Sequence, residues 1–347
     1  MKFIRDFLVI FLITFICCEV VVRLFGYSPY RVNPFSIDSE PSLALLPDSR
    51  LGFVLNPGNY QLTVNDHVTY SVTHLPDSNR VTTFEIALDS FPKGRIDVHG
   101  CSFTYGWGVD DSLSFPFLLQ NALPEWDVRN EAVPGFGTLN SLLVIEDQIK
   151  RQDKPDIILL NYAGFHDERN ALAPNYRKAL KHGFEHSNSA VKPLLANQAF
   201  PYGKISGDSL LVISQDWDSM YNNWPLRKVS ALIHFFQYVN DQQLESYARS
   251  FDVTKLIFEA IKTQCVVNDI RLIVCGITDD AATSAMLDNL VNKGFETYTT
   301  GIDLTELQYN HLPHDSHPNA AAHQIFTEEA LQYLREGNPQ NAIDLDK

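Results

Sequence analysis

The regular alternation of short apolar runs with amphipathic stretches after Arg95 constrains the fold more than any other feature of this chain. Strands that alternate with helices form parallel βαβ units, whose ligands bind at the carboxyl ends of the strands. The pattern predicts an α/β domain with a doubly wound, three-layer parallel sheet over residues 93–337. The predicted strands are residues 96–98, 127–130, 157–160, 271–276 and 295–298, and the predicted helices are 115–123, 139–150, 253–265, 281–291 and 318–336.

Three further segments depart from this alternation. Residues 27–92 lack a helical period, and alternating runs at 60–64 and 68–73 predict a small β-rich module. Residues 168–250 form an insertion rich in aromatic side chains, with one strand-like run at 210–214. An insertion of this length is typical of a lid or binding loop, and an extra packing layer is the alternative. Residues 338–347 are predicted to be a polar tail.

The first 26 residues predict a signal anchor, that is, a transmembrane helix that is not cleaved. Lys2 and Arg5 precede an apolar stretch which, counted to Phe25, is long enough for a hydrocarbon core of about 30 Å. Glu19 and Arg23 are four residues apart and can pair on one helix face near the far interface. No convincing cleavage site follows, so we expect a membrane-anchored protein whose main domain lies outside the cytoplasm. Secretion after cleavage, or a buried helix of a soluble protein, are the alternatives.

Charge and cysteine usage narrow the function classes. The net charge of −15 argues against a nucleic-acid-binding protein, because such proteins carry an excess of basic residues that contact phosphates. The five cysteines form no CxxC pair and no zinc-finger spacing, so no metal site is expected. Cys265 and Cys275 could pair in an oxidising compartment or remain buried free thiols.

Three polar or glycine-containing segments lie just past predicted strands or before the last helix. The first, Gly-Cys-Ser-Phe-Thr-Tyr-Gly at 100–106, exposes the Ser102 hydroxyl, a nucleophile if a base removes its proton. The second, at 130–138, contains Gly135, where a backbone N–H can approach a substrate oxygen closely. The third, at 314–319, contains His317 as a candidate base and Asp315 as the carboxylate that orients its ring.

In this order, the segments resemble the blocks of the SGNH/GDSL hydrolase superfamily of esterases and lipases. The resemblance covers residues 95–336 and implies a flavodoxin-like fold. It makes Ser102 the nucleophile, His317 the base, and the backbone N–H groups of Ser102 and Gly135 donors to the oxyanion. The combination with an N-terminal anchor resembles a membrane-anchored bacterial subgroup. Related envelope members act on O-acyl groups of polysaccharides.

Three positions depart from the family pattern. Cys101 replaces the usual Asp, which leaves a cysteine nucleophile as an alternative to Ser102. His166 stands at the place of the third-block Asn, and its ring N–H could fill the oxyanion hole. The usual Asp lies three residues before the His, where this chain has His314; we expect Asp315 to take the role, with a Ser–His dyad as the alternative.

These residues predict a serine esterase that hydrolyses an O-acyl ester of a small molecule or a cell-envelope glycan and needs no metal or organic cofactor. Transfer of the acyl group to a sugar hydroxyl would use the same acyl-enzyme. A non-catalytic envelope-binding protein on a decayed hydrolase scaffold is the alternative from another class. The sequence leaves the oligomeric state open.

Overall fold

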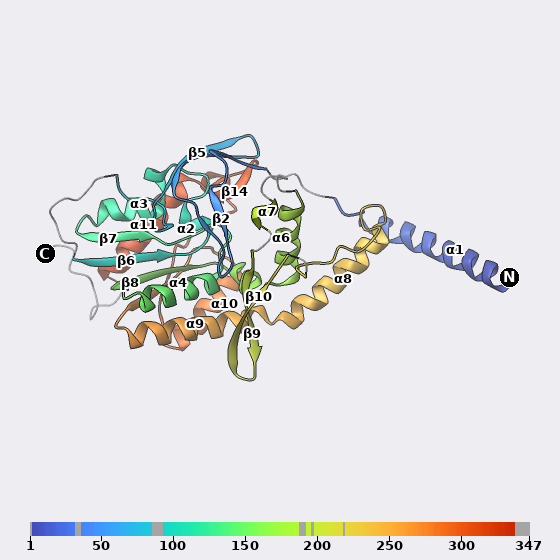
Figure 1. The fold of residues 1–347 in the computed structure, drawn as a ribbon. Coiled ribbons are helices and arrows are strands. Elements are labelled where there is room, and N and C mark those ends of the chain that lie inside the picture. The colour runs from blue at the N-terminus through green and yellow to red at the C-terminus, as the bar shows by residue number, and fades with distance from the viewer. Residues whose placement is uncertain are drawn as a thin grey trace.

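A computed structural model describes residues 2–31, 36–84, 93–186, 192–195, 198–217 and 219–336. The predicted tail at 338–347 lies outside the described residues. The described chain forms an α/β body from which a long N-terminal helix projects (Figure 1).

A five-stranded, fully parallel sheet forms the centre of the body, as the sequence predicts. In spatial order its strands are β7 (Trp126–Asn130), β6 (Gly94–His99), β8 (Ile157–Tyr162), β11 (Arg271–Gly276) and β12 (Glu296–Thr299). Numbered by their sequence within this sheet, the order is 2-1-3-4-5, which is the flavodoxin-like arrangement. The chain reverses direction across the sheet beside β6, and this switch point is where such folds bind ligands.

Helices cover both faces of the sheet and complete the three layers. On one face α4 (Thr138–Lys150), α9 (Ser250–Val267) and α10 (Ala281–Asn292) bury their apolar sides against β8 and β11. On the other face α3 (Phe115–Ala122) and α11 (Ala320–Glu336) do the same. The fold class predicted from the alternation is therefore confirmed.

The predicted start of the last helix at residue 318 is wrong. Pro318 ends strand β14 (Asp315–Pro318), which pairs with β13 (Asn310–His311). Helix α11 starts two residues later, because the side chain of Asn319 caps it. Its Oδ1 accepts hydrogen bonds from the N–H groups of Ala321 and Ala322 at 3.0 and 3.3 Å.

The β-rich segment before the body packs directly on it. Strands β1 (Ile37–Glu40), β4 (Gly58–Val64) and β5 (Val68–His74) form an antiparallel sheet, and β2 (Leu45–Asp48) and β3 (Gly52–Leu55) form a hairpin. Alternate residues of β4 and β5 are buried. They share one apolar core with residues of the loops that follow β6 and β7, namely Tyr105, Trp107, Ala132, Val133 and Phe136. The β-rich segment thus supports the edge of the sheet where ligands are expected.

The insertion contains more regular structure than the sequence predicts. The run at 210–214 lies in β10 (Ser209–Gln215), which pairs with β9 (Phe200–Ser206), and this hairpin packs on α9. The insertion also contains α6 (Pro174–His186), α7 (Lys192–Leu195) and α8 (Ala231–Ala248). Pro201 and Gly203 hide the strand character of β9, and α8 carries apolar residues on several sides because it contacts both α6 and α1.

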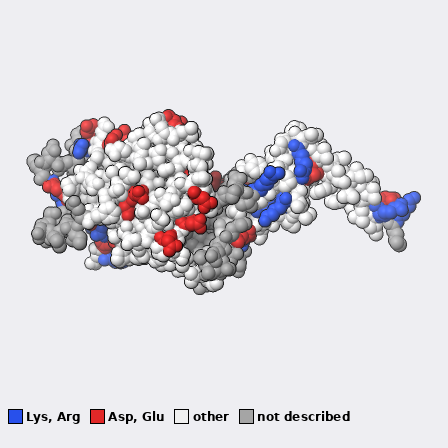
Figure 2. All heavy atoms as spheres, turned by 90° about the horizontal axis from the view of Figure 1, so that it is seen from above, with Lys and Arg blue, Asp and Glu red and all other residues white. Residues whose placement is uncertain are grey.

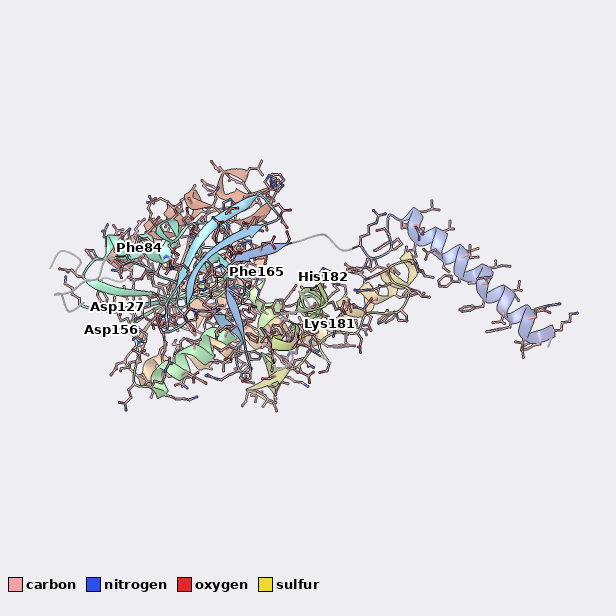
Figure 3. The ribbon with its side chains drawn as sticks, turned by 45° about the horizontal axis from the view of Figure 1, so that its top comes forward. Phe84, Asp127, Asp156, Phe165, Lys181 and His182 are labelled. Carbon is pink, nitrogen blue, oxygen red and sulfur yellow. The ribbon has the colours of Figure 1, made fainter. Side chains whose placement is uncertain are left out.

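Helix α1 (Lys2–Leu24) is long and apolar enough to cross a membrane, and none of its described residues is buried. In Figure 1, α8 runs from the body towards α1 and meets its carboxyl end. Figure 3 shows the two ends of the sheet: Asp127 and Asp156 lie at the edge far from α1, whereas Phe165 lies at the opposite edge, towards α6. The carboxyl ends of the strands therefore face the side of the molecule that carries α1.

Candidate active site

Ser102 lies just past the carboxyl end of strand β6, which is next to the central strand β8. It is the first residue of the short helix α2 (Ser102–Tyr105) and is 5% exposed. Gly100 allows the chain to turn closely here, since a Cβ at this position would collide with the side chain of Thr104. The turn directs the Ser102 hydroxyl towards His317, and the distance from Oγ to Nε2 is 3.0 Å.

Asp315 orients the other side of the His317 ring. The distance from His317 Nδ1 to Asp315 Oδ1 is 2.7 Å. Both residues belong to strand β14, where residues two apart point to the same face, so an Asp-x-His spacing is sufficient. Burial alone would raise the pKa of Asp315, but the hydrogen bonds and charge of His317 and the N–H of Trp107 outweigh it and lower the pKa.

His314, which occupies the family position of the acid, takes no part in this arrangement. Its side chain is exposed, and its ring lies 3.8 Å from that of His67 between centroids. The structure therefore brings Ser102, His317 and Asp315 together in one hydrogen-bonded line.

Trp107 is a site residue that the sequence analysis missed. Its indole N–H donates to Asp315 Oδ2 at 2.9 Å, and its ring packs against that of His317 with 5.4 Å between centroids. Phe103 packs edge-on against the same imidazole, also at 5.4 Å. Two aromatic rings thus hold the candidate base in place. The tryptophan directly after the first block was the available signal.

Gly135 lies in the loop that follows β7, and its backbone N–H is the second expected oxyanion donor. Its φ of +86° favours glycine, and a Cβ here would lie 2.8 Å from a ring carbon of Phe53. The Tyr176 hydroxyl donates to the Gly135 carbonyl at 2.8 Å and holds the peptide in position. Among the described residues, neither the Gly135 N–H nor the Ser102 N–H is used in a hydrogen bond, so both are available to a ligand.

His166 is buried at the start of α5 (His166–Asn170). Its ring contacts those of Tyr162 and Phe165, and neither ring nitrogen has a hydrogen-bond partner among the described residues. Burial, with a smaller effect of the Arg169 guanidinium, lowers the pKa of His166 well below its usual value. The ring is thus neutral at pH 7 and carries one N–H donor.

Cys101 is fully buried, and the structure shows no hydrogen bond between its thiol and His317, whose Nε2 faces Ser102 instead. Cys265 and Cys275 are buried free thiols. Within the described ranges, no group of three His, Cys, Asp or Glu side chains could hold a metal ion.

Arg80 is a second residue that the sequence analysis missed. It is buried after β5, where Nε pairs with Asp111 at 2.8 Å. Its terminal nitrogens donate to the carbonyls of Tyr105, Gly106 and Val109 at 2.7–3.0 Å. One guanidinium therefore holds the loop that carries Trp107 and ties it to the β-rich segment.

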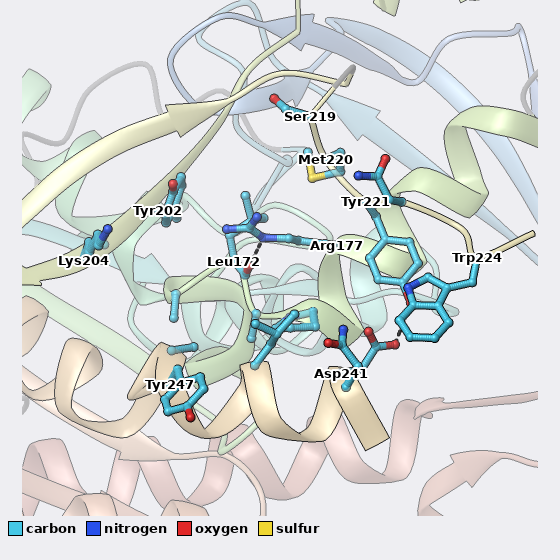
Figure 4. A pocket seen from close by; sticks show the side chains of 18 residues that line it. Leu172, Arg177, Tyr202, Lys204, Ser219, Met220, Tyr221, Trp224, Asp241 and Tyr247 are labelled. Atoms are coloured by element: carbon cyan, nitrogen blue, oxygen red, sulfur yellow. Dashed lines mark hydrogen bonds between the residues drawn. The ribbon is translucent and has the colours of Figure 1, made fainter. Parts of the chain in front are cut away.

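A separate cavity of about 610 Å³ lies beside α8 (Figure 4). Arg177 extends across it, and the Tyr221 hydroxyl donates to Asp241 at its edge at 2.6 Å. Neither Ser102, Gly135, His166 nor His317 lines this cavity, so it is distinct from the candidate active site.

No family model matches the sequence, and no curated protein matches it. Among solved structures, it is similar to a putative lipolytic protein of the G-D-S-L family from Desulfitobacterium hafniense, with 12% identity, a TM-score of 0.35, and coverage of 68% of this chain and 97% of that one.

Two further solved structures are similar at the same level. A psychrotrophic esterase from a Pseudoalteromonas species has 11% identity and a TM-score of 0.37, over 70% of this chain and 97% of that one. A catalytic mutant of an acetylxylan esterase from Geobacillus stearothermophilus has 11% identity and a TM-score of 0.35, over 70% and 94%. These values are too low to transfer a function to this chain.

Proposed function

We propose that this protein is a serine esterase of the SGNH type. The observation that carries the proposal is the line of hydrogen bonds from Ser102 Oγ to His317 Nε2, at 3.0 Å, and from His317 Nδ1 to Asp315 Oδ1, at 2.7 Å. A nucleophile, a base and an orienting carboxylate at these distances have the roles of a catalytic triad.

The reaction begins when Ser102 Oγ attacks the acyl carbonyl and His317 Nε2 takes the hydroxyl proton. The negative charge that develops on the carbonyl oxygen is stabilised by the N–H groups of Ser102 and Gly135, with the His166 ring as a third donor. Collapse of the tetrahedral intermediate breaks the bond to the alkoxide, which receives the proton from His317. Water then attacks the acyl-enzyme by the same steps and releases the acid.

Asp315 keeps the proton of His317 on Nδ1, so that Nε2 is free to accept the proton from Ser102. Its lowered pKa keeps the carboxylate charged, and that charge stabilises the imidazolium formed during attack. Trp107 and Phe103 restrict the ring to the orientation in which Nε2 faces the nucleophile.

The proposed substrate is an O-acyl ester on a cell-envelope glycan, reached from the outer side of the cytoplasmic membrane. Lys2 and Arg5 lie in the first turns of α1, and positive residues remain on the cytoplasmic side. Glu19 and Arg23 make contacts with residues 229–232, which supports the retention of α1 in the mature protein. The body would then work at the membrane surface.

The test is turnover of p-nitrophenyl acetate by the full chain in detergent. Replacement Ser102→Ala is expected to lower kcat by at least about 10³-fold, because the nucleophile is lost. Ser209→Ala, at an exposed position of β10, is the matched control and should leave turnover unchanged. Cys101→Ala should retain activity if Ser102 is the nucleophile.

An organophosphonate probe distinguishes an esterase from an inactive scaffold. Covalent labelling that disappears in Ser102→Ala is expected, and absence of labelling in the wild-type chain would overturn the proposal. Acyl transfer shares every step up to the acyl-enzyme, so acylated oligosaccharide formed from an acyl donor would identify the transferase alternative.

A further inference from the structure

The end of α1 is bound to the start of α8 by hydrogen bonds. The Glu19 carboxylate accepts hydrogen bonds from the Ser230 hydroxyl at 2.7 Å and from the N–H groups of Ala231 and Leu232 at 2.9 and 2.8 Å. These two N–H groups belong to the first turn of α8, where backbone N–H groups have no hydrogen-bond acceptor within the helix. The helix dipole also favours a carboxylate at this end. Glu19 is thus a cap supplied to α8 from another helix.

The adjoining residues bind the same segment. Arg23 pairs with Glu19 at 2.7 Å and donates to the Val229 carbonyl at 3.3 Å. Tyr30 lies under the Arg227 guanidinium, 3.9 Å from ring centroid to Cζ, and its N–H donates to the Arg227 carbonyl at 2.9 Å. Residues 226–236 therefore lie beside the last turns of α1.

This position sets the segment's depth in a bilayer. The 23 residues of α1 extend about 34 Å at a rise of roughly 1.5 Å per residue, against a hydrocarbon core of about 30 Å. The last turn of α1 therefore reaches the interfacial layer on the far side of the membrane. Arg23 in that turn bonds to Val229, and Glu19, about one turn deeper, bonds to residues 230–232, so the start of α8 lies at the inner boundary of this layer.

Apart from Lys228, the exposed side chains of this segment are apolar. Leu226 is 64% exposed and Val229 is 67% exposed, and Phe236 is exposed beside them. The apolar surface continues onto Leu24 and Phe25 of the α1 end. Apolar surface of this kind, continuous with a membrane-spanning helix, is stabilised by contact with acyl chains rather than water.

Cationic and aromatic side chains accompany the apolar ones. Lys228 within the segment, Trp224 just before it, and Arg31 are exposed. In Figure 2, Lys and Arg gather where the region around α8 meets α1, although the chain carries a net charge of −15. Indole rings favour membrane interfaces, and anionic headgroups attract each nearby cation.

We propose that residues 224–236 form a second membrane contact, inserted into the interfacial layer of the same leaflet that the end of α1 reaches. The partner is the bilayer surface itself, with anionic phospholipid. Two attached elements restrain the body more than one helix on a flexible linker would, and the carboxyl edge of the sheet remains turned towards the membrane (Figures 1 and 3). The proposal rests on retention of α1 and not on esterase activity.

The test uses the full chain in nanodiscs of phosphatidylcholine and phosphatidylglycerol. Cys17→Ser and Cys18→Ser remove the two exposed thiols, because the other three cysteines are buried. A nitroxide is then placed by Val229→Cys, and its collision rates with oxygen and with an aqueous nickel chelate are measured by EPR. The oxygen-to-nickel ratio is expected to be severalfold higher than that of the matched control Val267→Cys. Val267 is an exposed valine at the end of α9, on the body.

Ile10→Cys in the middle of α1 tests the anchor independently. A label at Ile10 in lipid, with Val229 and Val267 equally accessible to the chelate, would overturn the second contact while leaving the anchor intact. A label at Ile10 in water would overturn both. Dipolar broadening between Val229 labels that neither reagent reaches would mean that a second copy covers the segment, which also overturns the proposal.

Discussion

At the scale of single residues, the site combines the hydrogen-bonded residues Ser102, His317 and Asp315 with other groups that hold them in position. One carboxylate oxygen of Asp315 is hydrogen-bonded to His317, and the other accepts a hydrogen bond from Trp107. His166 differs from His317 and Trp107, because its ring is buried, neutral and without a hydrogen-bond partner among the described residues. A buried donor without a partner costs free energy, which is repaid when a ligand accepts the hydrogen bond.

Replacement of His166 tests its role as an oxyanion donor. His166→Ala is expected to lower kcat by about 10²–10³-fold with little change in KM, since the hydrogen bond strengthens only in the transition state. His166→Asn places a side-chain amide donor at the same position and should restore most of the loss. Equal kcat values for the wild type and His166→Ala, measured with p-nitrophenyl acetate, would exclude the ring as a donor.

Replacement of Trp107 separates its hydrogen bond to Asp315 from the packing of its ring against His317. Trp107→Phe keeps a ring against His317 but removes the N–H that Asp315 accepts. A hydrogen bond to a charged group contributes about 1.5–3 kcal/mol, so kcat is expected to fall by roughly 10–100-fold. Without this donor the pKa of Asp315 rises, and the acid limb of the kcat/KM profile should move to higher pH. An unchanged profile would contradict this positioning role.

At the scale of elements, the β-rich segment and the loop after α2 depend on each other. Strands β4 and β5 bury alternate side chains against Tyr105 and Trp107, and Arg80 binds three carbonyls of the same loop. The β-rich segment between α1 and the body therefore supports the candidate active site, although it contributes none of the residues Ser102, His317 and Asp315.

Replacement of Arg80 measures how much this contact contributes to the free energy of unfolding. Arg80→Met leaves the buried Asp111 carboxylate without its partner and is expected to destabilise the fold by about 3–5 kcal/mol. Arg50→Met is the matched control, because Arg50 also joins the β-rich segment to the body through Asp147, but both side chains are more than one-third exposed. It should cost at most about 1 kcal/mol. Urea unfolding in detergent measures both, and equal losses would contradict the expectation.

At the scale of the whole molecule, the carboxyl edge of the sheet and helix α1 lie on the same side. The end of α1, the start of α8 and helix α2, which begins at Ser102, all lie beyond the carboxyl ends of the strands (Figure 1). If α1 spans a membrane as we propose, the candidate active site faces the membrane surface, whatever ester it takes.

Buried histidines predict the response of the whole fold to acid. Burial is the main cause that lowers the pKa of His74 to about 4 and those of His99 and His323 to about 3, from an ordinary value of 6.5. Below pH 6.5 the unfolded chain binds protons that the native chain does not. Stability is therefore retained above that pH and lost as the pH falls towards 4.

His323 offers a test of this response. Its Nδ1 accepts a hydrogen bond from the Phe115 N–H at 3.2 Å, which protonation would break. His323→Gln is expected to reduce the slope of unfolding free energy against pH by about 1.4 kcal/mol per pH unit between roughly pH 5.5 and 4. Urea titrations at several pH values measure the slope, and an unchanged slope would show that His323 titrates equally in both states.

Local features of the sequence were sufficient for the fold class and for most elements. The hydrophobic period distinguishes strands from helices because it reflects which side of a segment meets the core, and the observed bounds of β11 agree with the predicted 271–276. The period failed at Pro318, where a side-chain cap decides the helix start, and in the insertion, where α8 packs against elements distant in sequence.

The sequence by itself determined that the chain folds as a doubly wound α/β domain behind an apolar helix, and which serine, glycine and histidine are the site candidates. Only the tertiary structure decided that Asp315 rather than His314 faces His317, and that Trp107 binds Asp315 across a separation of 208 residues. It also decided that Glu19 caps α8. Such contacts depend on how distant segments pack, whereas periodicity and turn chemistry depend on residues a few positions apart.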